Sequence, residues 1–365
     1  MKKVLMLLAN EFKPDVRVEK EARALTEAGY EVKVLAWDRT HSQSNKDYAG
    51  LKIEHIRTRK VRGKRSFFLS LPSLYLKMIV AGARSGAQIV HAHDLDTLLP
   101  SLVISKLKGI PLVYDAHEHY ARMVETDISK PLANILDRFE MLLVPKASLV
   151  IAANQKILEY LAPQIKGMSV VVMNCIDLLG VGRKKLEGDG KVVLFYGGSL
   201  EPLRYIEETL GAVENDERCI FRIAGRGRLQ SLVEAAAARC DRIIYIGYIS
   251  QKELLKELQN SDAVVVLFNS SNENNRIGTP NRLFEAMAMG VPVLASEGTL
   301  SGQIVDQEGC GIAIHWNRND FSAAIATLTD PKAKQKMGES GTRAATERYN
   351  WTEMRKRLID NYSRL

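Results

Sequence analysis

The chain has few cysteines, and its apolar runs are short. Its 365 residues include four cysteines, at positions 175, 219, 240 and 310. No two of them have the spacing of a zinc knuckle or a small disulfide framework, which favours reduced thiols and a cytoplasmic protein. The apolar segment 4–9 has only six residues and ends at Asn10, so we expect a buried strand there and not a signal peptide.

No segment reads as a membrane span. The nearest approach, residues 67–83, has 17 residues and is interrupted by Ser70, Pro72, Ser73 and Lys77. It is therefore too short and too polar to cross a bilayer as a helix. We expect a helix over residues 73–83 that packs on the first domain. The alternative is an interfacial helix whose apolar side dips into lipid.

The excess of positive charge lies in the first half of the chain. The net charge is +8; residues 1–172 carry 26 basic and 18 acidic side chains, whereas residues 173–365 carry 25 of each. Six basic residues of this half form a cluster: Arg57, Arg59, Lys60, Arg62, Lys64 and Arg65. Such a cluster suits an anionic surface, and a peripheral position on the inner face of a membrane is one interpretation. A solvated, charged loop is the other interpretation.

The composition and patterning indicate an α/β protein with two domains. Hydrophobic residues make up 46% and charged residues 26%, as in ordinary globular proteins, and the length exceeds that of one typical domain. Short apolar runs alternate with segments of helical period, which is typical of parallel sheets covered by helices on both faces. We expect strands near residues 4–8, 31–36, 53–56, 88–93, 112–116, 149–153, 170–173, 192–196, 220–224, 243–246, 263–268, 293–295 and 311–314.

The alternation lapses once, where glycines stand among charges, and this lapse predicts a linker. We therefore expect two Rossmann-like domains in tandem. The expected boundaries are 1–173 for the first domain, 174–190 for the linker, 191–345 for the second domain, and 346–365 for a C-terminal helix that could cross back to the first domain.

Polar residues directly follow several expected strands, and ligands of open α/β sheets bind beyond the carboxyl ends of the strands. Such residues lie at 10–17, 91–96, 114–119 and 197–199. The group at 91–96 contains two histidines and two aspartates, which are common metal ligands. The further ligands of a binuclear hydrolase are missing, however, and we expect no metal site. His117 and Glu118 form a polar pair that could bond sugar hydroxyls or orient a leaving phosphate; a structural histidine is the alternative.

One segment of the second half suits a nucleotide diphosphate. Gly198 and Ser199 precede an expected helix near Pro202, so that free amides, the helix dipole and Arg204 could face phosphates. The segment 225–227 has only two glycines, which disfavours a nicotinamide cofactor.

The most specific segment is 278–293. There Pro280 suits the first turn of a helix and Gly290 its end. Glu285 on this apolar helix needs a partner, either ribose hydroxyls or a structural arginine.

Taken in order, these motifs resemble those of retaining glycosyltransferases of the GT-B fold, family 4, over the whole chain. The resemblance is carried by residues 15–22 with 29–32, 91–94, 114–118, 174–177 and 280–293. It implies a nucleotide-sugar donor, UDP- or GDP-linked, held by the second domain. It also implies a glycan or lipid-linked acceptor, or a small molecule, held by the first domain, with transfer in the cleft. We expect no metal, no other cofactor and no nucleic acid as a partner.

The resemblance also assigns roles to single residues. His117, Glu118 and Arg204 would be catalytic, Glu285 would bind the ribose, and the acceptor side would include Asp15, Arg17 and His93. The remaining donor-site residues would be Gly198, Ser199, Tyr248, Ile249, Gly278, Thr279, Pro280, Asn281 and Arg282.

The chain departs from this family pattern at two positions. Ser199 stands where relatives often have an arginine, and Ile277 stands where they usually have an acidic residue, eight positions before Glu285. These departures keep two further hypotheses open: a glycosyltransferase-like binding or partner subunit without turnover, and a GT-B nucleotide-sugar epimerase.

Overall fold

The computed structural model describes residues 1–12, 15–41, 47–48, 50–61, 63–177 and 190–365. The chain divides into two compact units, which we call unit 1 and unit 2. Unit 1 comprises Met1–Met173 together with Met354–Leu365, and unit 2 comprises Asn174–Glu353. Most of the expected linker, residues 178–189, lies outside the described residues.

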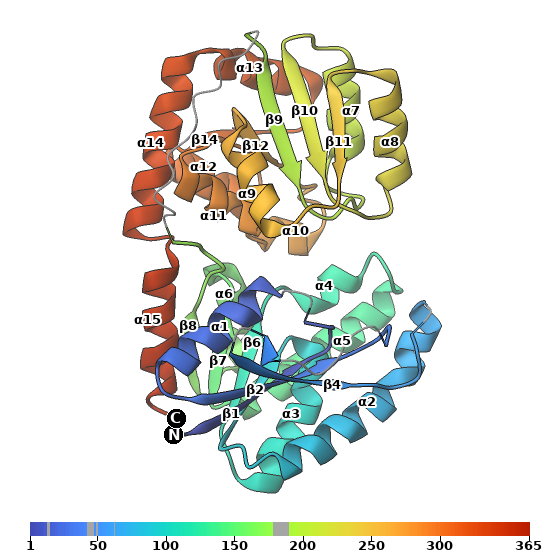
Figure 1. The fold of residues 1–365 in the computed structure, drawn as a ribbon, viewed down its shortest axis with the longest axis vertical. Coiled ribbons are helices and arrows are strands. Elements are labelled where there is room, and N and C mark those ends of the chain that lie inside the picture. Colours follow the sequence, from blue (N-terminus) through green and yellow to red (C-terminus); the bar gives the residue numbers. More distant parts are fainter. Residues whose placement is uncertain (13–14, 42–46, 49, 62, 178–189) are drawn as a thin grey trace. The chain divides into compact units, whose positions relative to one another are not determined.

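Unit 1 is built on an eight-stranded sheet with the order β3-β4-β2-β1-β5-β6-β7-β8, parallel except for the short β3 (Figure 1). The sequence pattern missed β3 but located the other strands. They are β1 (Lys3–Leu8), β2 (Glu31–Trp37), β3 (Asp47–Tyr48), β4 (Leu51–Ile56), β5 (Ile89–His93), β6 (Leu112–Ala116), β7 (Leu149–Ala152) and β8 (Met168–Val171).

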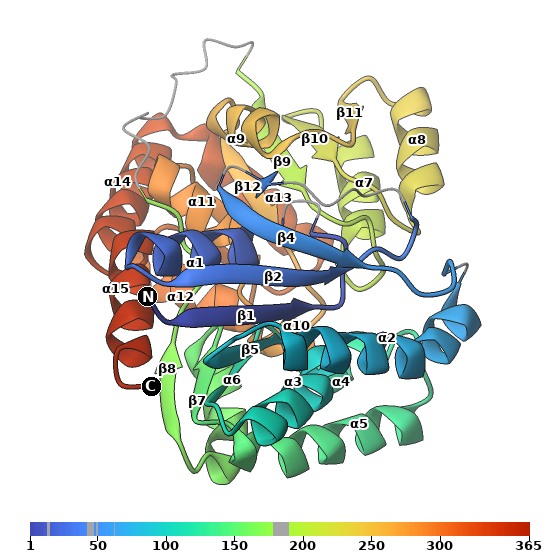
Figure 2. The ribbon, with the colours of Figure 1, turned by 60° about the horizontal axis from the view of Figure 1, so that its bottom comes forward.

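Helices cover both faces of this sheet. Helices α2, α3 and α5 lie on one face, and α1 and α15 lie on the other (Figure 2). The central strands β1, β5, β6 and β7 are almost wholly buried because both faces are covered. The helices of unit 1 are α1 (Val16–Glu27), α2 (Lys64–Arg84), α3 (Leu95–Lys108), α4 (Tyr120–Val124), α5 (Lys130–Leu143), α6 (Gln155–Leu161) and α15 (Trp351–Tyr362), of which α15 begins at the end of unit 2.

Helix α2 differs from its expectation. The sequence predicted a helix over 73–83, but α2 begins at Lys64 and continues through Pro72. The argument from length against a membrane span was therefore wrong: residues 66–84 are long and apolar enough to cross a bilayer, and only 22% of that window is buried. Pro72 was taken as an interruption, whereas the helix packs on both sides of it. Phe67 lies against the ring of Trp37, and Leu74 and Met78 are fully buried.

Unit 2 is built on a six-stranded parallel sheet with the order β11-β10-β9-β12-β13-β14 (Figure 1). Its order reverses between β9 and β12, which is the arrangement of a doubly wound Rossmann-like sheet. The strands are β9 (Val192–Gly197), β10 (Cys219–Ala224), β11 (Ile243–Gly247), β12 (Ala263–Val266), β13 (Val293–Ser296) and β14 (Gly311–Ile314).

One face of the unit 2 sheet packs in a single apolar cluster with α7, α8 and α13. Helices α9 and α11 contact β9 and β12. The helices are α7 (Ile206–Glu214), α8 (Gln230–Arg239), α9 (Gln251–Gln259), α10 (Glu273–Ile277), α11 (Asn281–Met289), α12 (Leu300–Glu308), α13 (Arg318–Thr329) and α14 (Pro331–Glu347).

The end of the chain corrects one expected boundary. A single helix over 346–365 is wrong, because α14 runs to Glu347 and α15 begins at Trp351. The break has a local cause: the side chain of Asn350 accepts a hydrogen bond from the backbone amide of Glu353 and so starts the second helix. From Met354 onward the chain belongs to unit 1, where the Tyr362 hydroxyl lies 2.6 Å from Nδ1 of His91.

Candidate functional site

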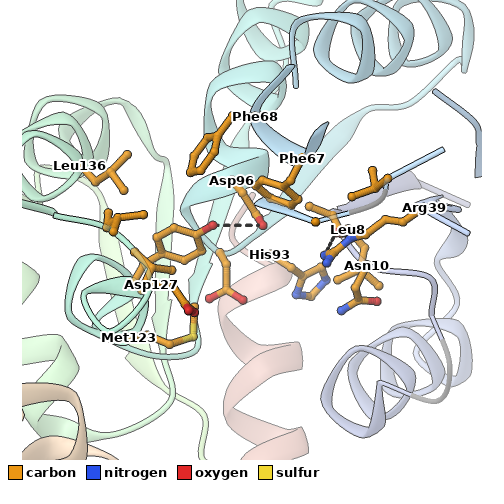
Figure 3. Close-up of a pocket in the computed structure, with 17 residues that line it drawn as sticks. Leu8, Asn10, Arg39, Phe67, Phe68, His93, Asp96, Met123, Asp127 and Leu136 are labelled. Carbon is orange, nitrogen blue, oxygen red and sulfur yellow. Dashed lines mark hydrogen bonds between the residues drawn. The ribbon is translucent and has the colours of Figure 1, made fainter. Parts of the chain in front are cut away.

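A cavity of about 480 Å³ opens in unit 1 at the point where its strand order reverses. Its walls include residues that follow β1 and β5, the two strands between which the sheet changes direction. This is the place where doubly wound sheets bind ligands. The lining residues are Leu8, Ala9, Asn10, Arg39, Val61, Gly63, Phe67, Phe68, His93, Asp94, Asp96, Tyr120, Met123, Val124, Asp127, Ile128 and Leu136 (Figure 3).

Beneath this cavity lies a buried network of charged side chains. The guanidinium of Arg17 donates to both oxygens of Asp115, at 2.9 and 2.5 Å, and to the carbonyl of Val172 at 2.7 Å. It also lies 3.2 Å from Glu21. Burial and the nearby Asp115 raise the pKa of Glu21 to about 8. Arg17 was expected to face the acceptor, but the structure places it in this network and not among the residues that line the cavity.

Two histidines connect the network to the carboxyl end of the sheet. His117 lies between Asp115, at 2.8 Å, and Asp94, at 3.1 Å. Burial alone would lower the pKa of His117, but the two carboxylates outweigh it and hold the pKa well above its usual range. His93 Nδ1 lies 3.2 Å from Asp115, and burial lowers its pKa. At neutral pH the pair therefore consists of a charged His117 beside a neutral His93.

The network includes a group that could hold a metal by composition. Glu21, His91, His93 and Asp115 place ligand atoms within 4.8 Å of one another. The guanidinium of Arg17 already contacts both carboxylates of this group. A cation there would have to displace a buried positive charge, so the residues do not fit a metal site well.

The other residues predicted for unit 1 lie nearby in different roles. Asp15 caps α1, where its side chain accepts from the amide of Val18 and from Asn10. Glu118 is exposed. The sequence missed Arg39, Asp127 and Leu136 as cavity residues. Arg39 could have been found because it follows β2 closely, whereas α4 and α5 give no comparable signal.

In unit 2, Arg204 lies at the point where the strand order reverses. Arg204, which follows β9, stacks over the ring of Phe268, which follows β12, at 5.1 Å. Burial raises the pKa of Tyr196, and Arg204 and Arg282 both oppose this rise. That hydroxyl donates to the carbonyl of Ser199 at 2.6 Å.

The loop after β9 is not the expected helix start. A helix near Pro202 is wrong: α7 begins at Ile206, because Leu203 and Tyr205 have φ of +65° and +46° and cannot belong to a right-handed helix. Arg204 lies between these two residues. The loop also passes very close to the next one, since a Cβ on Gly225 would lie 1.8 Å from the carbonyl oxygen of Gly198. Glycine at 225 therefore permits the close approach of the two loops.

The segment before and within α11 follows the sequence prediction. Pro280 precedes the helix as its N-cap, and Gly290 ends it with φ of +67°. Within this helix, Glu285 is 1% exposed and forms a short ion pair with Arg282. Gln251 donates to Glu285 at 2.8 Å. Of the two partners considered for Glu285, the structure therefore shows the arginine.

The remaining predicted donor residues surround the same edge of the sheet. Arg226 lies over the ring of Tyr248, 4.7 Å from its centroid, and Tyr248 is 66% exposed. Ile249 follows it. Asn281 accepts from Asn174 at 2.8 Å, and the carbonyl of Gly278 accepts from Ser301 at 3.2 Å. Thr279 lies between Gly278 and Pro280.

The strand order of the two units defines the fold as that of GT-B glycosyltransferases, and solved structures agree. Sucrose-phosphate synthase from Thermosynechococcus elongatus matches with a TM-score of 0.80 at 16% identity, covering 100% of this chain and 99% of that one. Anabaena Alr3699/HepE in complex with UDP and glucose matches with a TM-score of 0.75 at 15% identity, covering 99% of each chain.

The chain belongs to the glycosyltransferases: residues 15–178 match Glycosyltransferase Family 4, and residues 190–330 match Glycosyl transferases group 1. A curated relative, glycogen synthase from Mycobacterium tuberculosis, is 25% identical over 281 residues. The matched region covers 72% of this chain and 65% of that relative, so it spans just under two thirds of the relative's length.

Proposed function

We propose that this protein transfers a sugar, with retention of anomeric configuration, from a nucleotide-diphosphate donor held by unit 2 to a hydroxyl of an acceptor held by unit 1. The acceptor oxygen forms the new bond to the anomeric carbon, and the bond from that carbon to the phosphate oxygen breaks. The nucleoside diphosphate leaves, and the hydroxyl proton leaves with it. The protein carries out this reaction without a metal or another cofactor.

The observation that carries the proposal is the position of Arg204, which follows β9 and stacks over Phe268 after β12, where the strand order of unit 2 reverses. A cation at a switch point, beside a loop that approaches its neighbour closely, suits a diphosphate whose charge grows as the glycosidic bond breaks. A solved GT-B structure similar to this chain is described in complex with UDP-glucose, which supports a donor of this class.

The two alternative functions each lack a different part of the transfer reaction. A partner subunit binds nucleotide but neither hydrolyses the donor nor transfers its sugar. An epimerase changes the sugar without an acceptor. The absence of an acidic side chain at Ile277 motivates the first alternative.

The test is steady-state kinetics on the full chain with UDP- and GDP-sugars. Because Arg204 faces charge that develops in the transition state, Arg204→Ala should lower kcat more than it raises KM. Arg239→Ala is the matched control, since Arg239 is exposed at the end of α8 and pairs with Glu214 at the end of α7. A rise in KM with unchanged kcat would contradict the role. Donor binding without turnover would favour the partner subunit.

We also propose that unit 1 associates with the cytoplasmic face of an anionic membrane through α2. Phe68, Leu69, Leu76 and Val80 are exposed by 44, 72, 64 and 40%. The opposite side of the helix packs inward: a Cβ on Gly82 would lie 2.4 Å from Ile104 of α3. A helix with one packed side and one exposed apolar side suits the lipid interface better than a span.

The basic cluster expected to contact the headgroups is only partly described. Arg57 pairs with Asp38, Arg59 and Lys60 are exposed, and Arg62 lies outside the described residues. Co-sedimentation with phosphatidylglycerol vesicles tests the proposal. Binding should require acidic lipid, weaken as salt rises, and fall in Leu69→Ser/Leu76→Ser. Binding that survives neutralisation of Arg59, Arg62 and Arg65 would remove the electrostatic part, and no binding at low salt would refute the proposal.

A further inference from the structure

The cavity of unit 1 has two chemically different ends. Phe68 and Leu136 lie at one end, Asn10 and His93 lie at the other, and Asp96 lies between them (Figure 3). The apolar end also contains Val124 and Ile128 in its lining. A cavity with an apolar and a polar end suits a ligand that combines both characters.

The polar end contains an unsatisfied buried atom. The side chain of His93 is fully buried, and among the residues that the structure describes its Nε2 has no hydrogen-bond partner. His93 Nδ1 lies 3.2 Å from the carboxylate of Asp115, which can only accept, so we assign the ring proton to Nδ1 and a lone pair to Nε2. A ligand hydroxyl that donates to Nε2 would satisfy it, and leaving such an atom unpaired is costly.

The charge of the lining selects against anions. Asp94, Asp96 and Asp127 line the cavity, and Arg39 is the one cation among the lining residues that the structure describes. The Arg39 guanidinium donates to the carbonyl of Ala9, which holds it in place and leaves its charge unchanged. Three acidic side chains against one cation in the described lining therefore disfavour a phosphate or carboxylate on the ligand.

From these observations we infer that the acceptor is a non-anionic amphiphile. Its hydroxyl-bearing head contacts His93 and Asp94, and its apolar part lies against Phe67, Phe68 and Leu136. That this ligand is the acceptor of the transfer rests on the proposed function, but its binding can be measured without any donor.

Three probes separate the two parts of the inference. Octyl β-D-glucoside has both a neutral head and an apolar chain, methyl β-D-glucoside lacks the chain, and octyl β-D-glucuronide adds a carboxylate. Calorimetric titration of the full chain below the critical micelle concentrations should show octyl glucoside binding at least about tenfold more tightly than either of the others.

Variants assign the preference to this cavity. Phe68→Ala should reduce the advantage of octyl over methyl glucoside, and Asp94→Asn, at the polar end, should reduce the discrimination against the glucuronide. Leu107→Ala is the matched control, because Leu107 is 66% exposed in the same unit and does not line the cavity. It should leave all three affinities unchanged.

The possible failures are distinct. Equal affinity for octyl and methyl glucoside, tighter binding of the glucuronide, or no binding of any probe by protein that binds nucleotide would overturn the inference. If octyl glucoside binds as expected but the protein neither binds a nucleotide sugar nor transfers from it, the proposed function fails and the ligand class of the cavity stands.

Discussion

Units 1 and 2 share a doubly wound strand order, yet the carboxyl edges of their sheets differ in chemistry. Unit 1 buries an ion pair of Arg17 with Asp115 there, beside Glu21. Unit 2 places Arg204 after β9, near two loops that approach each other closely, and buries Glu285 in an ion pair with Arg282. The same topology therefore carries a buried ion pair beneath a cavity in one unit and an arginine at the strand ends in the other. Residues of the first helices after the strands, as well as of the strand ends, make this difference.

Breaking the unit 1 network should have the largest effect. Arg17→Leu leaves the Asp115 and Glu21 carboxyls buried without their cation, which should lower the free energy of unfolding by about 3–5 kcal/mol. Urea denaturation followed by circular dichroism measures it. Arg23→Leu is the control on the same helix: its ion pair with Glu19 is partly exposed, and its loss should cost at most about 1 kcal/mol. Similar losses for the two variants would show that the network contributes little.

The corresponding change in unit 2 should affect binding as well as stability, because Glu285 is buried and pairs with Arg282. Glu285→Gln replaces a charge-assisted acceptor by a neutral one, and we expect nucleotide-sugar affinity to fall by about 1–3 kcal/mol. Calorimetric titration measures the loss. Glu257→Gln is a control, since Glu257 pairs with Arg222 in unit 2 outside the predicted donor residues. Unchanged affinity in folded Glu285→Gln would remove Glu285 from the donor site.

The smallest expected effect is a pH slope that belongs to unit 1. Burial raises the pKa of Glu21 to about 8, above its unfolded value, so the folded state holds a proton that the unfolded state has lost. Stability should therefore fall as pH rises towards 8. The raised pKa of His117 acts in the same direction. The pKa values of His91 and His93 are lowered in the folded state, so their contribution acts in the opposite direction. It raises the free energy of unfolding as pH rises, and it is complete above the unfolded-state pKa of about 6.5.

The measurement is the free energy of unfolding between pH 6.5 and 8 for the parent and for Glu21→Gln. The variant cannot titrate at this position, so its slope should be flatter. Equal slopes would mean that Glu21 is ionised throughout the range.

The fold was predictable because its signal is local. The strands of a covered parallel sheet are short, mainly apolar runs, and β6 and β14 were found with their observed bounds. The start of α7 was not predictable, because Leu203 and Tyr205 adopt positive φ without being glycine. The continuation of α2 through Pro72 was not predictable either, because α2 packs against α3 and this contact leaves no local signal in the sequence.

The site was predictable only in part, because its contacts connect residues far apart in the chain. Strand ends pointed to His93 and Arg204, but nothing local indicates that Arg17 pairs with Asp115, 98 positions away, or that Gln251 bonds Glu285, 34 positions away. Such pairs decide whether a polar side chain is free to meet a ligand. The sequence pattern located the carboxyl edges of the sheets but not the hydrogen-bond partners of the polar side chains there.

The return of α15 to unit 1 has a consequence for the order of events during synthesis. Tyr362 is fully buried, packs against Tyr30 and contacts His91, so unit 1 is incomplete until these residues arrive. Asn174–Glu353 must be translated first. At roughly 5–20 residues per second, that interval lasts roughly 10–40 s. Throughout it, the surface of unit 1 that α15 will cover faces the cell's chaperones, whereas unit 2 can complete its core as soon as it emerges from the ribosome.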